Sequence, residues 1–278
     1  MLTWSQGYFD PLDLNSLANM FVHDAIVVIK TNNLTDTLTE LCTDNLTPEQ
    51  LEAAAQGLGI PASSLQALHL CVYSSFSLVG VIGGEYTMTF SKDNHRLTAS
   101  TKINTPVPLY NLYFAAPSGN PLDSLGFIYG NIDDPDTLGN AYRWFAKRIN
   151  RYPTWTPDAD LRGTQKDFGY IAPFGSVADD SFFNGLNFEF NYYRGREVNS
   201  SKFDDQNSES GFFKRGDTVA VRGCSMDHRA FDFFFSMENQ VANQGSPFGL
   251  PSNVKSNVSG GLGVFVGYGA VYDTVICQ

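Results

Sequence analysis

The residue types that catalyse reactions occur in this chain, but not at the spacing that catalysis requires. The four histidines, His23, His69, His95 and His228, are scattered, and none belongs to the HExxH motif that binds catalytic zinc. The chain has no GxSxG segment to present a nucleophilic serine. The sequence GGLG at residues 260–263 leads into a strand-like segment, so it lacks the helix N-terminus that binds phosphate. We therefore expect a protein that is not an enzyme.

An acidic cluster between two strand-like segments is the best candidate for a metal site. It comprises Asn131, Asp133, Asp134 and Asp136, whose side-chain oxygens are the ligands that calcium prefers. The cluster lacks the glycine and the distal glutamate of a helix–loop–helix calcium loop, and Pro135 restricts its backbone. A plain turn between strands is the simpler interpretation. We expect no cofactor, unless this cluster holds a structural calcium ion.

Aromatic residues around a proline-rich turn are the candidate ligand-binding site. Trp144, Tyr152 and Trp155 flank this turn, and aromatic rings in loops can stack on sugars or peptides. The chain has 22 Phe and 13 Tyr, so some aromatic side chains must be exposed by chance alone. The patch is therefore a hypothesis, with a glycan or a peptide as its ligand.

The four cysteines fall as one pair in each half of the chain. Because no two of them form a CxxC motif, we predict two structural disulfides, Cys42–Cys71 and Cys224–Cys277, made in an oxidising compartment. Four buried free thiols are the alternative. Each disulfide would add roughly 3–4 kcal/mol to stability by constraining the unfolded chain.

Composition favours β-structure and argues against nucleic-acid binding and against a membrane-spanning helix. The chain has 278 residues, 25 Gly and 13 Pro, with 14% aromatic and 17% charged residues, which is typical of β-sandwiches with many turns. Its net charge of −11, without a basic stripe, repels nucleic acid. No apolar run is long enough for a transmembrane helix, and no signal peptide is recognisable. We expect that an export signal, if the protein has one, has been removed.

Residues 1–105 are predicted to form an immunoglobulin-like β-domain. The segment 25–30 is β-branched and is followed after a turn by the strand-like segment 34–41, while 84–90 and 96–101 flank a second turn. A helical hairpin is predicted as an insertion at residues 42–71. Its first helix begins with Thr47-Pro48-Glu49-Gln50, a capping box with proline at the first helical position.

Residues 106–278 are predicted to form a second β-sandwich-type domain with one packed helix. The segments 126–130, 141–149, 187–193 and 217–224 are strand-like, and the apolar segment 264–272 is expected to be a central closing strand. The helix is expected near residues 225–241, with Ser225 as its N-cap. Its wide apolar face indicates core packing, with an aromatic ligand groove as the alternative.

Five segments together indicate a family. They are GGEYTMTFSKDNHRLTASTKINTPVPL (83–109), DDPDTLGNAYRW (133–144), SFFNGLNFEF (181–190), SMDHRAFDFFFSME (225–238) and SNVSGGLGVFVGYG (256–269). In this order they resemble the Bacteroidota outer-membrane lipoprotein family called domain of unknown function 4249. The resemblance extends over nearly the whole chain. The chain departs from the family in its 42–71 insertion and at Ala141, where the family more often has an aromatic residue.

The resemblance implies a setting and a partner but no catalytic residue. Members of this family are exported, anchored to the outer membrane by a lipid on a cysteine, and often encoded beside a TonB-dependent transporter. We therefore expect a non-enzymatic surface lipoprotein that captures a ligand for such a transporter and contacts the membrane only through its anchor. The alternative is a structural or adhesive envelope lipoprotein that binds other proteins. A hydrolase would require a cleft with converging acidic or histidine side chains.

Overall fold

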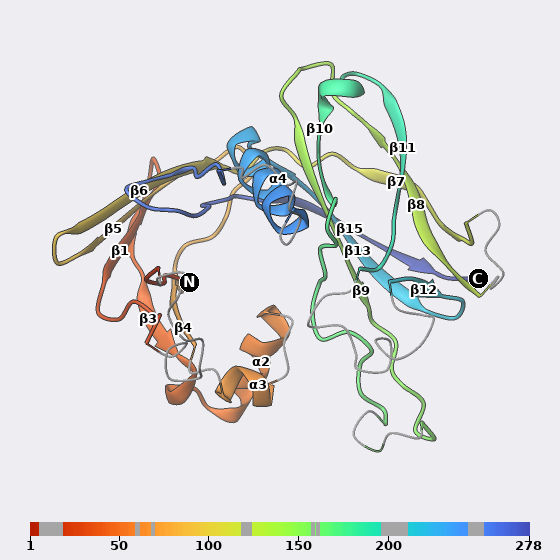
Figure 1. Cartoon of the computed structure of the whole chain (residues 1–278), viewed down its shortest axis with the longest axis horizontal. Coiled ribbons are helices and arrows are strands. Elements are labelled where there is room, and N and C mark those ends of the chain that lie inside the picture. The colour runs from red at the N-terminus through yellow and green to blue at the C-terminus, as the bar shows by residue number, and fades with distance from the viewer. Residues whose placement is uncertain are drawn as a thin grey trace.

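The computed structural model describes residues 1–5, 19–58, 62–67, 70–117, 124–156, 159, 162–195, 211–243 and 253–278, and Figure 1 shows its architecture. The fold is mainly β, with several antiparallel sheets and one longer helix, as the sequence predicted. An immunoglobulin-like topology for the first part stays a prediction. No helix within these ranges is long and apolar enough to cross a membrane.

The N-terminal sheet combines strands from both ends of the chain. Its order is β14 (Val258–Ser259), β6 (His95–Lys102), β5 (Glu85–Lys92), β1 (Ile26–Lys30) and β2 (Thr35–Thr37). The two predicted hairpins, β1–β2 and β5–β6, are confirmed. Because β14 pairs with β6, residues near 258 complete a sheet that otherwise belongs to residues 26–102. The proposed domain boundary near residue 105 stays a prediction.

The predicted insertion is a small helical unit closed by a disulfide. It runs from β3 (Thr39–Cys42) through η1 (Thr43–Asn45), α2 (Pro48–Leu58) and α3 (Ala62–Ala67) to β4 (Cys71–Ser74). The capping box is present, since the Gln50 backbone N–H donates to Thr47 Oγ1 at 3.3 Å and the Thr47 N–H to Gln50 Oε1 at 2.9 Å. Cys42 and Cys71 are directly opposed on β3 and β4 and form the predicted disulfide.

Two further sheets pack face to face in the C-terminal half. One has the order β10 (Val177–Asp179), β9 (Ala141–Arg148), β13 (Thr218–Met226) and β15 (Gly269–Ile276). In the other, β8 (Leu125–Asp133) pairs with β7 (Leu109–Ala115), β11 (Asn187–Tyr192) and β12 (Phe213–Lys214). Side chains from both sheets form the core between them, among them Ile128, Phe213, Trp144, Val219 and Val221.

The longer helix, α4 (His228–Ala242), lies between the N-terminal sheet and these two sheets (Figure 1). Asp227, and not Ser225, is its N-cap, and its side chain accepts from the Ala230 backbone N–H. Ser225 instead belongs to β13, because that strand continues further than the sequence predicted. Asp227 also accepts a 2.5 Å hydrogen bond from the Thr101 hydroxyl on β6, which ties the helix start to the N-terminal sheet.

The C-terminal segment differs from the prediction of a central closing strand. Only residues from Gly269 onward form β15, and β15 is the last strand in the order of its sheet. The preceding residues pack against α4 through Val264, Val266 and Tyr268. A Cβ atom at Gly269 would clash with the Asn104 carbonyl oxygen, and one at Gly267 would clash with the Ile103 side chain. The apolar character of this segment therefore reflects contact with a helix and not a central position in the sheet.

The predicted Cys224–Cys277 disulfide is wrong, because both thiols are free and buried. The strand register explains why. Cys224 is paired with Ala270 near one end of the β13–β15 ladder, whereas the Cys277 N–H bonds to the Asp217 carbonyl at the other end. This separation along the strand is roughly 23 Å at about 3.3 Å per residue, far beyond the 7 Å or so that a disulfide can bridge.

Candidate functional site

The three predicted aromatic residues do not form a binding patch. Trp144 is only 3% exposed, because the alternation along β9 turns it into the core, where it stacks on Tyr192. Tyr152 is also buried. Trp155 is 79% exposed, so it is the only one of the three that a ligand could stack on. The sequence did not reveal this difference, because β9 has apolar residues on both of its faces.

The acidic cluster is not assembled as a metal site. Asp133 Oδ1 accepts from the Tyr110 hydroxyl at 2.6 Å and from Asn187 Nδ2 at 2.7 Å. Asp134 is buried and accepts from the Tyr142 hydroxyl and the Gly185 backbone N–H. Asn131 donates to Asn187, and Asp136 lies beside Gly185. Protein donors therefore take up the Asp133 and Asp134 carboxylates, which suits the alternative of a structured turn.

A second cluster of metal-binding residue types surrounds the disulfide. Within the described residues, His23 and Glu40 have ligand atoms close to the sulfurs of Cys42 and Cys71. The His23 ring lies 2.7 Å from the Glu40 carboxylate, which also accepts from the Asp24 backbone N–H. Because both sulfurs belong to the disulfide, neither is a thiolate ligand. This arrangement is a polar contact at the base of the helical insertion.

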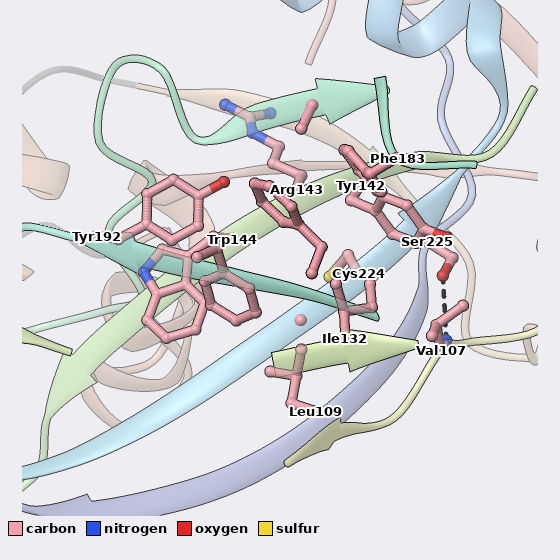
Figure 2. A pocket seen from close by; sticks show the side chains of 14 residues that line it. Val107, Leu109, Ile132, Tyr142, Arg143, Trp144, Phe183, Tyr192, Cys224 and Ser225 are labelled. Atoms are coloured by element: carbon pink, nitrogen blue, oxygen red, sulfur yellow. Dashed lines mark hydrogen bonds between the residues drawn. The ribbon is translucent and has the colours of Figure 1, made fainter. Parts of the chain in front are cut away.

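An apolar pocket lies between the two C-terminal sheets (Figure 2). Its cavity volume is about 50 Å³. Most of its wall is apolar or aromatic, including Leu109, Ile132, Trp144 and Phe190. The Ser225 hydroxyl in its wall is engaged by the Val107 backbone N–H at 3.2 Å. The pocket can hold an apolar group, but it offers few directional contacts to choose one.

A different hollow lies on the other face of the β9–β13 sheet, beside α4. We call it the helix groove; its volume is about 280 Å³. It is lined by Arg143, Phe145, Tyr170, Ile171, Ala172, Phe174, Met237 and Glu238. Since side chains alternate along a strand, Arg143 and Phe145 point to this face while Tyr142 and Trp144 point into the core. Figure 2 agrees, because the Arg143 guanidinium extends away from Leu109 and Ile132.

Arg143 lines the helix groove, and Arg222, which does not line it, packs against two rings that do, Phe145 and Tyr170. The Arg143 guanidinium lies 3.7 Å from the Phe234 ring centre and 5.2 Å from that of Phe145. On the other side, the Arg222 guanidinium lies 3.9 Å from Phe145 and 4.6 Å from Tyr170. All four distances are within the range of cation–π attraction. The rings hold both guanidiniums in fixed positions.

Neither arginine has an acidic partner among the described residues, since no ion pair joins Arg143 or Arg222 to a carboxylate within 4 Å. Arg143 donates one hydrogen bond, from Nη1 to the Tyr268 hydroxyl at 3.1 Å. The Nε atoms of both arginines are buried and have no acceptor. Uncompensated charge of this kind costs free energy, so its presence calls for an explanation.

Titratable groups around the arginines are shifted by burial. Burial raises the pKa of Glu238, although the Gly175 backbone N–H and the positive charge of Arg143 oppose that rise. Burial also raises the pKa of Tyr268 and brings the pKa of the Cys224 thiol to about 11, again opposed by the two arginines. Glu238 is therefore a weakened counter-charge for Arg143, and its carboxylate is engaged by Gly175 at 2.8 Å.

A family model for domain of unknown function 4249 (DUF4249) matches residues 2–272. The chain belongs to the DUF4249 family. No curated protein and no solved structure matched it. The groove of this DUF4249 protein therefore has to be interpreted from its own geometry.

Sequence reasoning missed both arginines of this DUF4249 protein, although a signal was present. Arg143 stands in AYRWFA and Arg222 in VAVRGC, so each charged residue has only uncharged, mostly apolar neighbours close to it in its strand. A charge in such a position is either paired or functional. The sequence suggested an aromatic groove on the helix as an alternative to core packing. The groove in the structure is formed by β9 residues together with the helix.

Proposed function

We propose that this DUF4249 protein is a non-enzymatic, surface-anchored lipoprotein that captures a ligand for a TonB-dependent outer-membrane transporter. The observation that carries the proposal is the helix groove, in which the Arg143 guanidinium, without an ion-pair partner among the described residues, stands among aromatic rings. A concave, mostly apolar site with a few oriented polar groups is the usual form of a ligand site.

The composition of the groove favours binding without turnover. Glu238 is the one carboxylate in its lining, and no histidine or serine lines it. A hydrolytic site would need a nucleophile or water-activating base beside a second polar group. The arginines and rings supply charge and stacking surface instead, which are means of recognition.

The cellular setting in this proposal comes from the family resemblance. An exported lipoprotein meets ligands at the outer membrane, and a TonB-dependent transporter beside it would carry the ligand inward. The Cys42–Cys71 disulfide supports export, because disulfides persist in oxidising compartments. The net charge of −11 suits a role that does not involve nucleic acid.

The test is a pull-down of the full-length lipidated protein from its native outer membrane, read by mass spectrometry. We expect one TonB-dependent transporter in nearly stoichiometric amount. Recovery of only other lipoproteins or surface polymers would contradict the transporter role and favour the structural alternative.

One observation favours that alternative, a structural or adhesive lipoprotein. The loop between β4 and β5 exposes four apolar side chains, with Phe76 81%, Val79 76%, Val81 61% and Ile82 57% accessible. A contiguous exposed apolar segment is typical of a protein-binding surface. Replacing Phe76 and Val79 by serine separates the two functions. If this variant recovers no partner in the pull-down while its helix groove is unchanged, partner binding belongs to this loop.

A further inference from the structure

The chemistry of the helix groove defines the charge of its ligand. The guanidiniums of Arg143 and Arg222 lie 5.2 Å and 3.9 Å from the centre of the same Phe145 ring, and like charges that approach each other in this way repel. Glu238 does not neutralise them, because it forms no ion pair in the described structure and is engaged by Gly175. An anion placed at this end of the groove would relieve the repulsion.

The stacking of the guanidiniums defines the shape of that anion. The Nε atom of Arg143 is buried, so the edge that its guanidinium can offer to a ligand is the one formed by Nη1 and Nη2. Such an edge matches the two oxygens of a planar carboxylate, which accept two parallel hydrogen bonds. The rings also prevent the arginines from turning away, so the geometry is formed before the ligand arrives.

The rest of the groove defines the body of the ligand. Ile171, Ala172, Phe174 and Met237 line it, and they offer apolar surface without hydrogen-bonding side chains. A second hollow adjoins at Phe174 and Glu238 and is lined by Val177, Phe235 and Val241. Phe174 and Phe235 are about half exposed, at 48% and 51%. An apolar chain or ring system attached to the anion would cover these side chains and gain the free energy of their burial.

We infer that the helix groove binds a small amphiphilic carboxylate, with its carboxylate at Arg143, near the positive charge of Arg222, and its apolar body along α4. This inference rests on the proposed ligand-binding function and adds the chemical class of the ligand. A peptide fits less well, because its backbone amides would face the apolar wall without partners. A glycan fits less well too, because sugar hydroxyls need several hydrogen-bonding side chains, and the groove lining supplies few.

Calorimetric titration with dodecanoate and with its neutral amide tests the inference. We expect dodecanoate to bind at least about tenfold more tightly than dodecanamide, because charged hydrogen bonds to the arginines distinguish them. In the double variant Arg143→Met/Arg222→Met this preference disappears. The control Arg96→Met removes an exposed arginine on β6 and leaves the preference intact.

A second variant keeps the test valid if the double variant does not fold. Ala172→Trp fills the apolar part of the groove and leaves both arginines in place, and it should weaken dodecanoate binding while acetate is unaffected. Equal affinities for dodecanoate and its amide in the wild-type protein would overturn the inference, as would binding of a peptide carboxylate but not of dodecanoate. If the pull-down recovers the transporter and one of these two results is also obtained, only the inferred ligand class is wrong and the proposed capture function remains supported.

Discussion

The Arg222 guanidinium lies 3.9 Å from the centre of the Phe145 ring, on the neighbouring strand and directly opposite it in register. Arg148, on the same strand as Phe145, has a contrasting environment: it is fully buried and forms a double hydrogen bond to Asp167. One arginine is compensated by carboxylates and the other by aromatic rings alone. This difference separates a structural arginine from one that has no ion-pair partner among the described residues.

Replacing Arg222 by methionine is predicted to leave stability nearly unchanged. Methionine keeps the apolar contact with Phe145, and the change removes an uncompensated charge, so we expect a shift of less than about 1 kcal/mol in either direction. Urea denaturation followed by circular dichroism measures it. A loss of several kcal/mol would mean that Arg222 has a structural role.

Arg148→Met is the matched control and is predicted to be destabilising. It removes the Arg148 guanidinium from the buried Asp167 and Asp217, although Arg194 stays 3.9 Å from Asp167 and Lys166 stays 2.7 Å from Asp217. Removal of one partner from a buried ion pair costs about 3–5 kcal/mol. The same denaturation experiment measures the loss, and an effect as small as that of Arg222→Met would contradict the distinction between the two arginines.

Ligand affinity is predicted to depend on the charge of Glu238. Its pKa is raised by burial, so protonation begins at a higher pH than for an exposed glutamate and removes a negative charge near Arg143. Carboxylate affinity should therefore rise as the pH falls from neutral toward that pKa. Glu238→Gln should bind more tightly at neutral pH and lose the dependence, and titrations across this range compare the two proteins. An identical pH profile for both would contradict the prediction.

The raised pKa of Glu238 also predicts a small dependence of stability on pH, with a definite sign. Because the folded-state pKa of Glu238 is raised, the folded state holds the proton more tightly than the unfolded state. Stability from this group is present below the unfolded pKa and is lost as the pH rises through the folded pKa. Glu238→Gln should not show this loss, which thermal unfolding at a series of pH values would detect.

Calcium is predicted to have no effect on thermal stability. The carboxylates of Asp133 and Asp134 accept hydrogen bonds from protein donors, so a cation would have to break these contacts first. Thermal unfolding with calcium and with a chelator should give the same midpoint. An increase with calcium that is lost in Asp133→Asn would restore the metal site that the sequence suggested.

Breaking the Cys42–Cys71 disulfide is predicted to cost roughly 3–4 kcal/mol, because it closes a loop with a sequence separation of 29. Denaturation with and without a reductant measures this cost. Thiol titration of the unfolded, unreduced protein should detect two thiols, those of Cys224 and Cys277. No thiols would mean that these two residues pair after all.

Local sequence patterns predicted local structure well and long-range structure poorly. The capping box at Thr47 and the alternation in β5, β6 and β11 act over a few residues, and the structure confirms them. The pairing of β14 with β6 joins segments far apart in the sequence, and no local pattern contains it. The helix N-cap moved from Ser225 to Asp227 because β13 continues two residues beyond Cys224.

The site was harder to predict than the fold for a physical reason. β9 is covered on one face by the opposing sheet and on the other by α4, so apolar residues occur on both faces and alternation is lost. Trp144 and Phe145 therefore look equivalent in sequence, although one lies in the core and the other lines the groove. That Arg143 forms no ion pair among the described residues depends on the fold and cannot be derived from spacing.

The most direct test observes the arginine Nε–H groups by NMR during titration with dodecanoate. The signals of Arg143 and Arg222, assigned from the single methionine variants, are predicted to shift with a common saturation curve, while the signal of Arg96 stays fixed. Shifts of this kind would place the carboxylate at the two guanidiniums. A saturable interaction that leaves both signals unmoved would place the ligand elsewhere and contradict the account.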